Sequence, residues 1–289
     1  MEKECSLLIE IKKILAFFDL FEYPLTAYEI WEYLDKRPPL EEIVKTLENQ
    51  DKISQKNGFY FLAGREEIIT TRQKRHNYTL AKIKIARRFS RLFRIWPFIK
   101  MIAVSNIIGQ HNLRAESDID FFIITAPGRI WLTRLFCAGL AKILNRRPTT
   151  KNKQDKICLS FYISTDHLNL NDLKLPEVDP YFDYWLRGLV LLYNKKRTYE
   201  QFLIANGLKA IKSETTETLE ITTPSKNQFL NILENSAKRL QLKIMPAALK
   251  AEINRGRGVV IAESVLKLYL IDRRQEFLDK YEKKVRQLI

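Results

Sequence analysis

The strongest constraint on the fold of this chain is the segment 119–125, where Ile and Phe fill five of the seven positions. β-Branched and aromatic side chains favour extended backbone, and a short run this apolar indicates a buried strand. Pro127-Gly128 follows and predicts a turn. We therefore expect a strand inside a sheet at this point of the chain.

Three neighbouring segments predict an α/β core over residues 99–175. Residues 100–108 have the pattern of a strand and a turn, and residues 157–164 have the pattern of a further strand. Between them, residues 130–144 repeat apolar side chains at helical spacing. The expected core is a mixed sheet with helices.

Residues 1–64 predict a unit of three helices and a hairpin. Thr26 and Glu29 have the spacing of a capping box at the start of the second helix. Asn57-Gly58 lies between alternating apolar residues and predicts a two-residue hairpin turn. This content is typical of a winged helix.

The third helix of this unit has an acidic surface. A winged helix often binds DNA through that helix, which enters the major groove. Here it carries Glu41, Glu42 and Glu48 against Lys45, a poor match for phosphates. The charge favours a protein-contact or spacer role over a DNA-binding role.

Residues 65–98 predict a basic connector helix. Its arginines recur closely enough to lie mostly on one side of the helix, and they form either a solvated face or a phosphate-contacting ridge. The arginines concerned are Arg87, Arg88, Arg91 and Arg94.

Residues 176–289 predict a mainly helical region. A Thr-, Ser- and Glu-rich stretch at 213–226 predicts a loop, and residues 255–258 predict a turn before a long final helix. The whole chain is therefore expected to be an α+β protein with a winged helix before the central sheet and helices after it.

Composition limits the partners and the compartment. The formal net charge of +15 favours polyanions such as nucleotides and nucleic acid, and is equally consistent with general solubility. Three widely spaced cysteines indicate a reducing compartment, and Cys137 and Cys158 lie in apolar runs that predict small buried side chains. No apolar run is long enough to span a bilayer. We expect a cytoplasmic protein with no membrane partner.

Asp118-Ile119-Asp120 is the motif that carries chemistry. Alternation along a strand points both aspartates to the same face. Two carboxylates this close repel each other unless a cation lies between them, and hard divalent ions prefer oxygen ligands. A pair of solvated aspartates at a strand entry is the alternative for an isolated Asp-x-Asp motif.

The context of the motif resembles the nucleotidyltransferases of the DNA polymerase β superfamily. The resemblance is carried by a strand, a turn, a polar loop, then Ser117-Asp118-Ile119-Asp120 and an apolar strand. It implies that Asp118 and Asp120 are catalytic and hold Mg²⁺ or Mn²⁺. It also implies a Gly-Ser pair about ten residues earlier for nucleotide phosphates, and a third carboxylate on a following strand.

Two features depart from the family pattern. Asn106-Ile107 stands where the Gly-Ser pair should fall, directly after Ser105, and Ile107 has no side-chain donor for a phosphate. The strand at 157–164 contains no acid, although Asp155 lies at its entry. Two alternatives follow: Asp155 or a residue of the C-terminal region completes the metal site, or the site holds one metal weakly or none.

The remaining candidate ligands are polar and basic residues around the motif. Ser117 adjoins the aspartates, and the basic loop before the strand at 157–164 has donors for a triphosphate or an acceptor nucleic acid. A solvated surface loop is the alternative. The candidate nucleotide-binding residues are Ser105, Asn106, Arg114, Ser117, Lys151 and Lys153.

Two functions follow from these residues. The first is Mg²⁺-dependent transfer of a nucleoside monophosphate from a nucleoside triphosphate to an acceptor that the sequence does not identify. The second is a nucleotide- or nucleic-acid-binding protein that keeps the fold without turnover. Family analogy adds a third class, the partner in a toxin–antitoxin pair.

Overall fold

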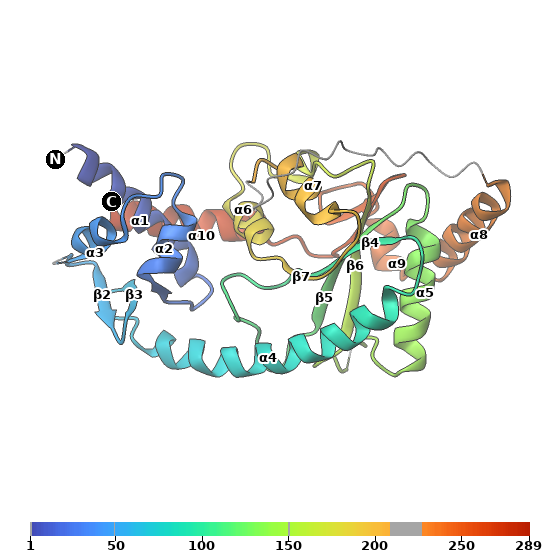
Figure 1. Ribbon diagram of the computed structural model, residues 1–289, viewed down its shortest axis with the longest axis horizontal. Helices are drawn as coiled ribbons and strands as arrows, with labels where there is room; N and C mark the ends of the chain where they lie inside the picture. Colours follow the sequence, from blue (N-terminus) through green and yellow to red (C-terminus); the bar gives the residue numbers. More distant parts are fainter. Residues whose placement is uncertain (1, 49, 150, 209–226) are drawn as a thin grey trace.

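The computed structural model describes residues 2–48, 50–149, 151–208 and 227–289. Within these ranges the chain is α+β: a six-stranded mixed sheet is flanked by helices, and a smaller three-stranded sheet lies in the N-terminal unit (Figure 1). The polar segment 213–226, for which a loop was expected, lies outside the described residues.

The N-terminal unit contains three helices and three short strands, as expected in outline. Thr26 and Glu29 form the predicted capping box, with each side chain bonded to the other's backbone. The predicted hairpin turn is also present, with Asn57 at φ 54° and Gly58 at φ 77°. The elements are α1 (Glu2–Asp19), β1 (Leu25–Thr26), α2 (Ala27–Tyr33), α3 (Leu40–Leu47), β2 (Ile53–Lys56) and β3 (Phe59–Leu62).

Helix α4 (Glu67–Phe93) joins this unit to the large sheet. It runs beneath the strands in Figure 1 and covers most of residues 65–98, for which a connector helix was expected. Its inward face is apolar in the second half, where Ile83, Phe89 and Phe93 pack into the core on one face of the sheet. The second half of the helix is therefore packed against the sheet.

The large sheet has the order β7-β4-β5-β6-β9-β8. Strand β5 is central and parallel to β6, while every other pair of neighbouring strands in this sheet is antiparallel. Its five Ile and Phe side chains are fully buried, which confirms the expected buried strand. The bounds are β4 (Ile99–Val104), β5 (Ile119–Thr125), β6 (Ile157–Ser164), β7 (Val190–Asn194), β8 (Val259–Ile261) and β9 (Val265–Leu268).

The expectation of a mainly helical region over 176–289 is wrong in one respect. Strands β7, β8 and β9 all belong to this segment and complete both sides of the sheet, so the expected core boundary at residue 175 divides one sheet. These strands are three to five residues long, too short to show a period. The turn predicted at 255–258 leads into the β8–β9 hairpin and not directly into the final helix.

Helices cover both faces of the sheet. Helices α5 and α8 pack on the same face as α4, and α6 and α7 contribute to the core on the other face. A short 3-10 helix, η1, precedes α6. The bounds are α5 (Ile130–Ile143), η1 (Asn171–Leu173), α6 (Pro180–Arg187), α7 (Thr198–Ala205), α8 (Gln228–Ile244), α9 (Ala247–Ala251) and α10 (Arg274–Leu288).

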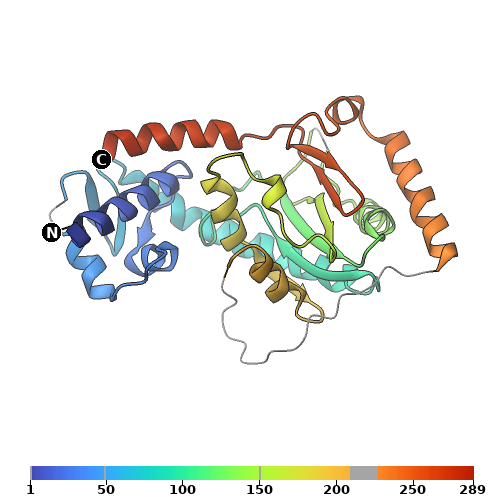
Figure 2. The ribbon, with the colours of Figure 1, turned by 90° about the horizontal axis from the view of Figure 1, so that it is seen from above.

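The last helix returns to the N-terminal unit. Helix α10 lies beside α1 in both views (Figures 1 and 2). Lys284 Nζ is 2.5 Å from the Oδ2 of buried Asp19, and Lys52 donates to the carbonyl of Gln287 at 2.8 Å. Apolar residues of α1, α6 and one face of the sheet form one continuous core, so the N-terminal unit is packed onto the rest of the molecule.

Arg274 anchors the start of α10. Its guanidinium contacts Asp179 Oδ2 at 2.8 Å and donates to the carbonyl of Leu173 at 2.8 Å, and both charged side chains are almost fully buried. Substitution of Arg274 by Met leaves the Asp179 carboxylate buried without its cation. We expect the free energy of unfolding to fall by about 3–5 kcal/mol, measured by urea denaturation.

Arg273→Met is the matched control. The neighbouring Arg273 side chain is 56% exposed and pairs with Glu276 on the surface. Its loss should cost less than about 1 kcal/mol. Equal losses in the two variants would show that the buried pair does not anchor α10.

Candidate functional site

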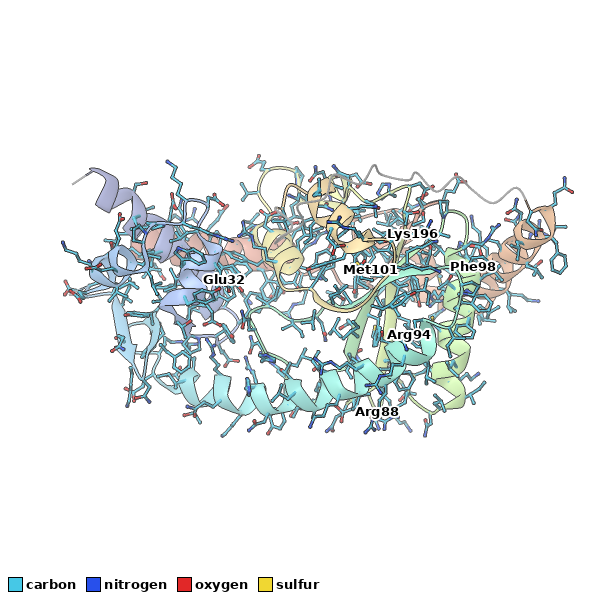
Figure 3. The ribbon with its side chains drawn as sticks, viewed as in Figure 1. Glu32, Arg88, Arg94, Phe98, Met101 and Lys196 are labelled. Carbon is cyan, nitrogen blue, oxygen red and sulfur yellow. The ribbon has the colours of Figure 1, made fainter. Side chains whose placement is uncertain are left out.

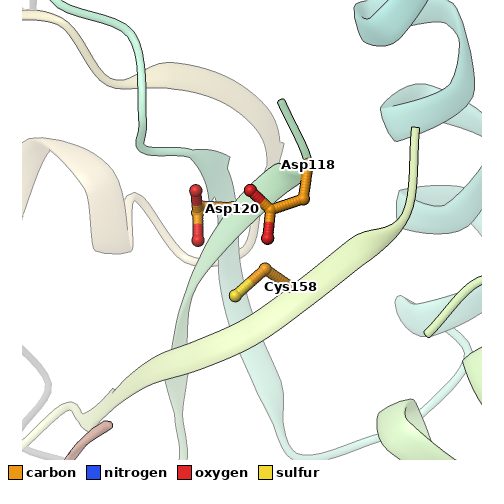
Figure 4. A group of neighbouring side chains, drawn as sticks. All are labelled: Asp118, Asp120 and Cys158. Atoms are coloured by element: carbon orange, nitrogen blue, oxygen red, sulfur yellow. The ribbon is translucent and has the colours of Figure 1, made fainter. Parts of the chain in front are cut away.

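Asp118 and Asp120 converge with Cys158 at the start of the central strand. The two carboxylates and the thiol each offer an atom within 4.8 Å of the other two (Figure 4). Asp120 is the register partner of Cys158 on the parallel strand β6. The expectation that both aspartates share a face of the strand is therefore confirmed, and the neighbouring strand adds a thiol to the pair.

A buried lysine holds the loop that leads into Asp118. The side chain of Lys82 on α4 is 2% exposed, and its ammonium donates to the carbonyls of Ala115 at 2.9 Å and Ser117 at 2.7 Å. It also pairs with Asp155 Oδ1 at 2.7 Å. Asp155 is thus engaged by Lys82, and the place opposite Asp120 on β6 is occupied by Cys158.

Ser105 and Asn106 hold the other side of the strand entry. The Ser105 amide donates to the carbonyl of Asp120 at 2.9 Å, and the Asn106 amide side chain donates to the carbonyl of Asp118 at 3.0 Å. Ile107 beside them is fully buried. Both side chains bond to the backbone that carries the aspartates and also line the cavity beside Asp120, and their contact with phosphate stays a prediction.

The four other candidate ligands divide into two groups. Ser117 adjoins Asp118, although its hydroxyl donates to the carbonyl of Arg114, and the charge of Lys153 acts on both aspartates. The Arg114 side chain is 66% exposed and pairs with Glu22 at 3.4 Å, away from the carboxylates. Lys151 is exposed and makes no polar side-chain contact among the described residues.

The titration of the cluster reflects its burial. Burial, and then the neighbouring charge of Asp118, raises the pKa of Asp120 from 3.8 to about 7. Burial raises the pKa of Asp118 as well. Burial and the two carboxylates raise the pKa of the Cys158 thiol. Like charges in a poorly solvated site favour protons or a bound cation, so a divalent ion here would displace protons.

A cavity of about 260 Å³ opens beside Asp120. Aromatic side chains from α6, from α10, from β6 and from the residue after β9 form much of its wall. Lys267, Asp272 and Arg274 supply charge. Burial lowers the pKa of Lys267 to about 8. The aromatic residues of the wall are Phe161, Tyr181, Phe182, Trp185, Tyr269 and Phe277.

Sequence reasoning missed Cys158 and the part of the cavity wall that lies beyond residue 260. Cys158 was interpreted as a small buried side chain, because the pairing of β5 with β6 could not be derived from either strand alone. The alternation Cys158-Leu159-Ser160 was the available signal, since it places a thiol and a hydroxyl on one face of a strand. Lys267, Tyr269 and Arg274 lie in a region for which only helices were expected.

Comparison with known proteins identifies no relative. No family model matches the chain, and no curated protein and no solved structure gives a significant match. Over the described residues, no helix has both the length and the apolar character that a membrane crossing requires.

The raised pKa of Asp120 predicts a pH-dependent stability. Between pH 3.8 and about 7 the folded protein keeps a proton that the unfolded chain has released. The free energy of unfolding of the metal-free wild type should therefore fall as the pH rises through this window, relative to Asp120→Asn, whose amide does not titrate. Urea unfolding at several pH values with a chelator present measures this difference.

Glu116→Gln is the control for this measurement. Glu116 is exposed in the same loop, two residues before Asp118, so the difference between this variant and the wild type should stay small across the window. If the difference in free energy of unfolding between Asp120→Asn and the wild type stays constant from pH 4 to pH 8, the pKa of Asp120 is not raised in the folded protein.

Proposed function

We propose that this protein is a Mg²⁺-dependent nucleotidyltransferase that acts through Asp118 and Asp120. The observation that carries the proposal is the pair itself: two half-buried carboxylates on one face of a central strand, beside a cavity. Such a pair binds a divalent cation more readily than it stays doubly charged without one.

The surrounding elements support the resemblance on which the proposal rests. A strand, β4, precedes a polar loop and then the aspartate strand β5, in the order expected for the polymerase β superfamily. The N-terminal order of helices and strands, with a hairpin after α3, fits a winged helix. Mn²⁺ is an alternative ion for the same oxygen ligands.

The residues have distinct roles in the proposed reaction. Asp118 and Asp120 would hold Mg²⁺, which when bound neutralises phosphate charge and orients the triphosphate. Lys153, exposed beside the pair, binds the triphosphate as a mobile cation. The acceptor hydroxyl oxygen forms a bond to the α-phosphorus, the bond to the β-phosphate oxygen breaks, pyrophosphate leaves and the hydroxyl proton passes to solvent.

The three side chains could hold a divalent ion, but one of their donor atoms is sulfur and not oxygen. Asp118 and Asp120 supply the hard oxygen ligands that Mg²⁺ prefers, whereas the Cys158 sulfur is a soft ligand that suits Zn²⁺ better. Mg²⁺ would therefore be held by two carboxylates, with substrate phosphates and water completing its coordination.

The second candidate function is nucleotide or nucleic-acid binding without turnover. The observation that favours it is the use of Ser105 and Asn106 as supports for the β5 backbone, which leaves the expected phosphate cradle without its usual donors. The presence of the Cys158 thiol in place of a third acid also favours binding without turnover.

Loss of the carboxylates should abolish Mg²⁺-dependent nucleotide binding. In titration calorimetry with each nucleoside triphosphate, the wild type should bind at least one of them, and removal of Mg²⁺ should weaken that binding. In the double variant Asp118→Asn, Asp120→Asn the dependence on Mg²⁺ should disappear, because amides carry no charge for the ion.

The matched control is Glu116→Gln with Glu263→Gln. Both glutamates are exposed and neither forms an ion pair within the described residues, so this variant loses the same charge elsewhere. It should bind like the wild type. Nucleotide binding that is absent, or that is unchanged in the aspartate variant, contradicts the proposed function. Binding without pyrophosphate release across a panel of acceptors favours the second candidate.

Substitution at Cys158 should change the preferred metal. Cys158→Asp adds a third carboxylate at the same position on β6, so Mg²⁺ affinity should rise by at least about tenfold. Cys158→Ala should leave Mg²⁺ affinity close to that of the wild type and weaken Zn²⁺ binding, because only the soft ligand is lost. Metal titrations of the three proteins without nucleotide test this, and equal affinities in all three would place Cys158 outside the metal site.

A further inference from the structure

The outer face of α4 carries a stripe of exposed cations. The side chains recur three, four and seven residues apart, which places them within about 120° of the helix circumference and along about 15 Å of its axis. Figure 3 shows Arg88 on the side of the helix away from the strands. The members of this α4 stripe are Lys84, Arg87, Arg88, Arg91 and Arg94, all exposed.

The charge of the α4 stripe is not compensated. The chain has no acidic residue between Glu67 and Glu116, and within the described residues none of the five cations forms an ion pair. The surface of α10 differs, because Lys280 pairs with Glu276 and Arg286 lies 3.8 Å from Glu282. A solvated helix face usually carries charges of both signs, as α10 does. The cations of the α4 stripe, unpaired among the described residues, therefore indicate an anionic partner.

The opposite face of the helix holds the stripe rigid. Ile83, Phe89 and Phe93 are buried against the sheet, and buried Lys82 binds the loop before Asp118. A helix that binds a lipid surface inserts an apolar face into it. The main apolar face of α4 is already covered by protein, and the large apolar side chains exposed near the stripe are only Leu80, Leu92 and Ile95 among the described residues, so charge dominates the surface offered to the partner.

We propose that the α4 stripe binds the phosphodiester backbone of a nucleic acid. Four of its five cations are arginines, whose planar guanidinium groups match phosphate oxygens in pairs. A row of fixed cations over about 15 Å meets several successive phosphates of one strand, and contacts of this kind bind without reading sequence.

The α4 stripe is separate from the carboxylate site. Lys82 points from α4 toward Ser117, next to Asp118, while Lys84 and Arg88 are exposed on another side of the helix. Binding at the stripe therefore does not require Asp118 or Asp120. The inference goes beyond the proposed function and does not rest on it, since the double aspartate variant should bind nucleic acid as well as the wild type does.

The test measures the salt dependence of nucleic-acid binding by fluorescence anisotropy. The probes are a labelled DNA duplex of mixed sequence and a labelled single-stranded RNA, and the variant is Arg88→Gln, Arg91→Gln, Arg94→Gln. At low salt its Kd for at least one probe should rise at least tenfold, and the slope of log Kd against log salt for the duplex should fall by about 3.

The matched control removes three exposed cations elsewhere: Arg239→Gln, Lys243→Gln, Lys283→Gln. Its Kd should stay within twofold of the wild type. Circular dichroism confirms that both variants are folded, since Gln is a good helix former. Equal losses in the two variants would assign the binding to net charge, and no loss in the α4 variant would place it on another surface. Binding to anionic phospholipid vesicles with none to either nucleic acid would also overturn the proposal.

Discussion

The placement of the two aspartates depends on one buried ammonium group. Lys82 satisfies its charge with two carbonyls and the carboxylate of Asp155, and this joins α4 to the loops that precede β5 and β6. A buried cation without such partners costs several kcal/mol. The two loops therefore keep the positions in which they bond to the ammonium group. The entry of the central strand is thereby fixed from outside the sheet.

The same loop is also held by the N-terminal unit. Tyr23 donates to the carbonyl of Gln110, and Arg75 donates to the carbonyl of Phe21 and to Asn112. The helices before the sheet therefore support the chain that carries Asp118. This support gives the N-terminal unit a structural role whatever it binds, and it fits the acidic character of α3, which made direct phosphate contact a poor match.

Features with a local cause could be predicted from the sequence. The buried strand at 119–125, the hairpin turn at Asn57-Gly58 and the connector helix each depend on neighbours within a few residues. Strands β7 to β9 and the position of Cys158 depend on pairing between distant segments, which no local pattern contains. Ser105 and Asn106 show the same limit at the site, because their hydrogen bonds go to a backbone that the sequence alone cannot place.

The position of α10 beside α1 has a consequence for synthesis on the ribosome. Leu288 belongs to the same core as Leu7 and Ile11 of α1, and Lys284 neutralises Asp19 at the end of that helix. The packing of α1 is thus completed by α10, which is synthesised only after the roughly 250 residues that separate the two helices. Until then an apolar surface of the nascent chain stays uncovered, and chaperones that bind such surfaces have a long period in which to act.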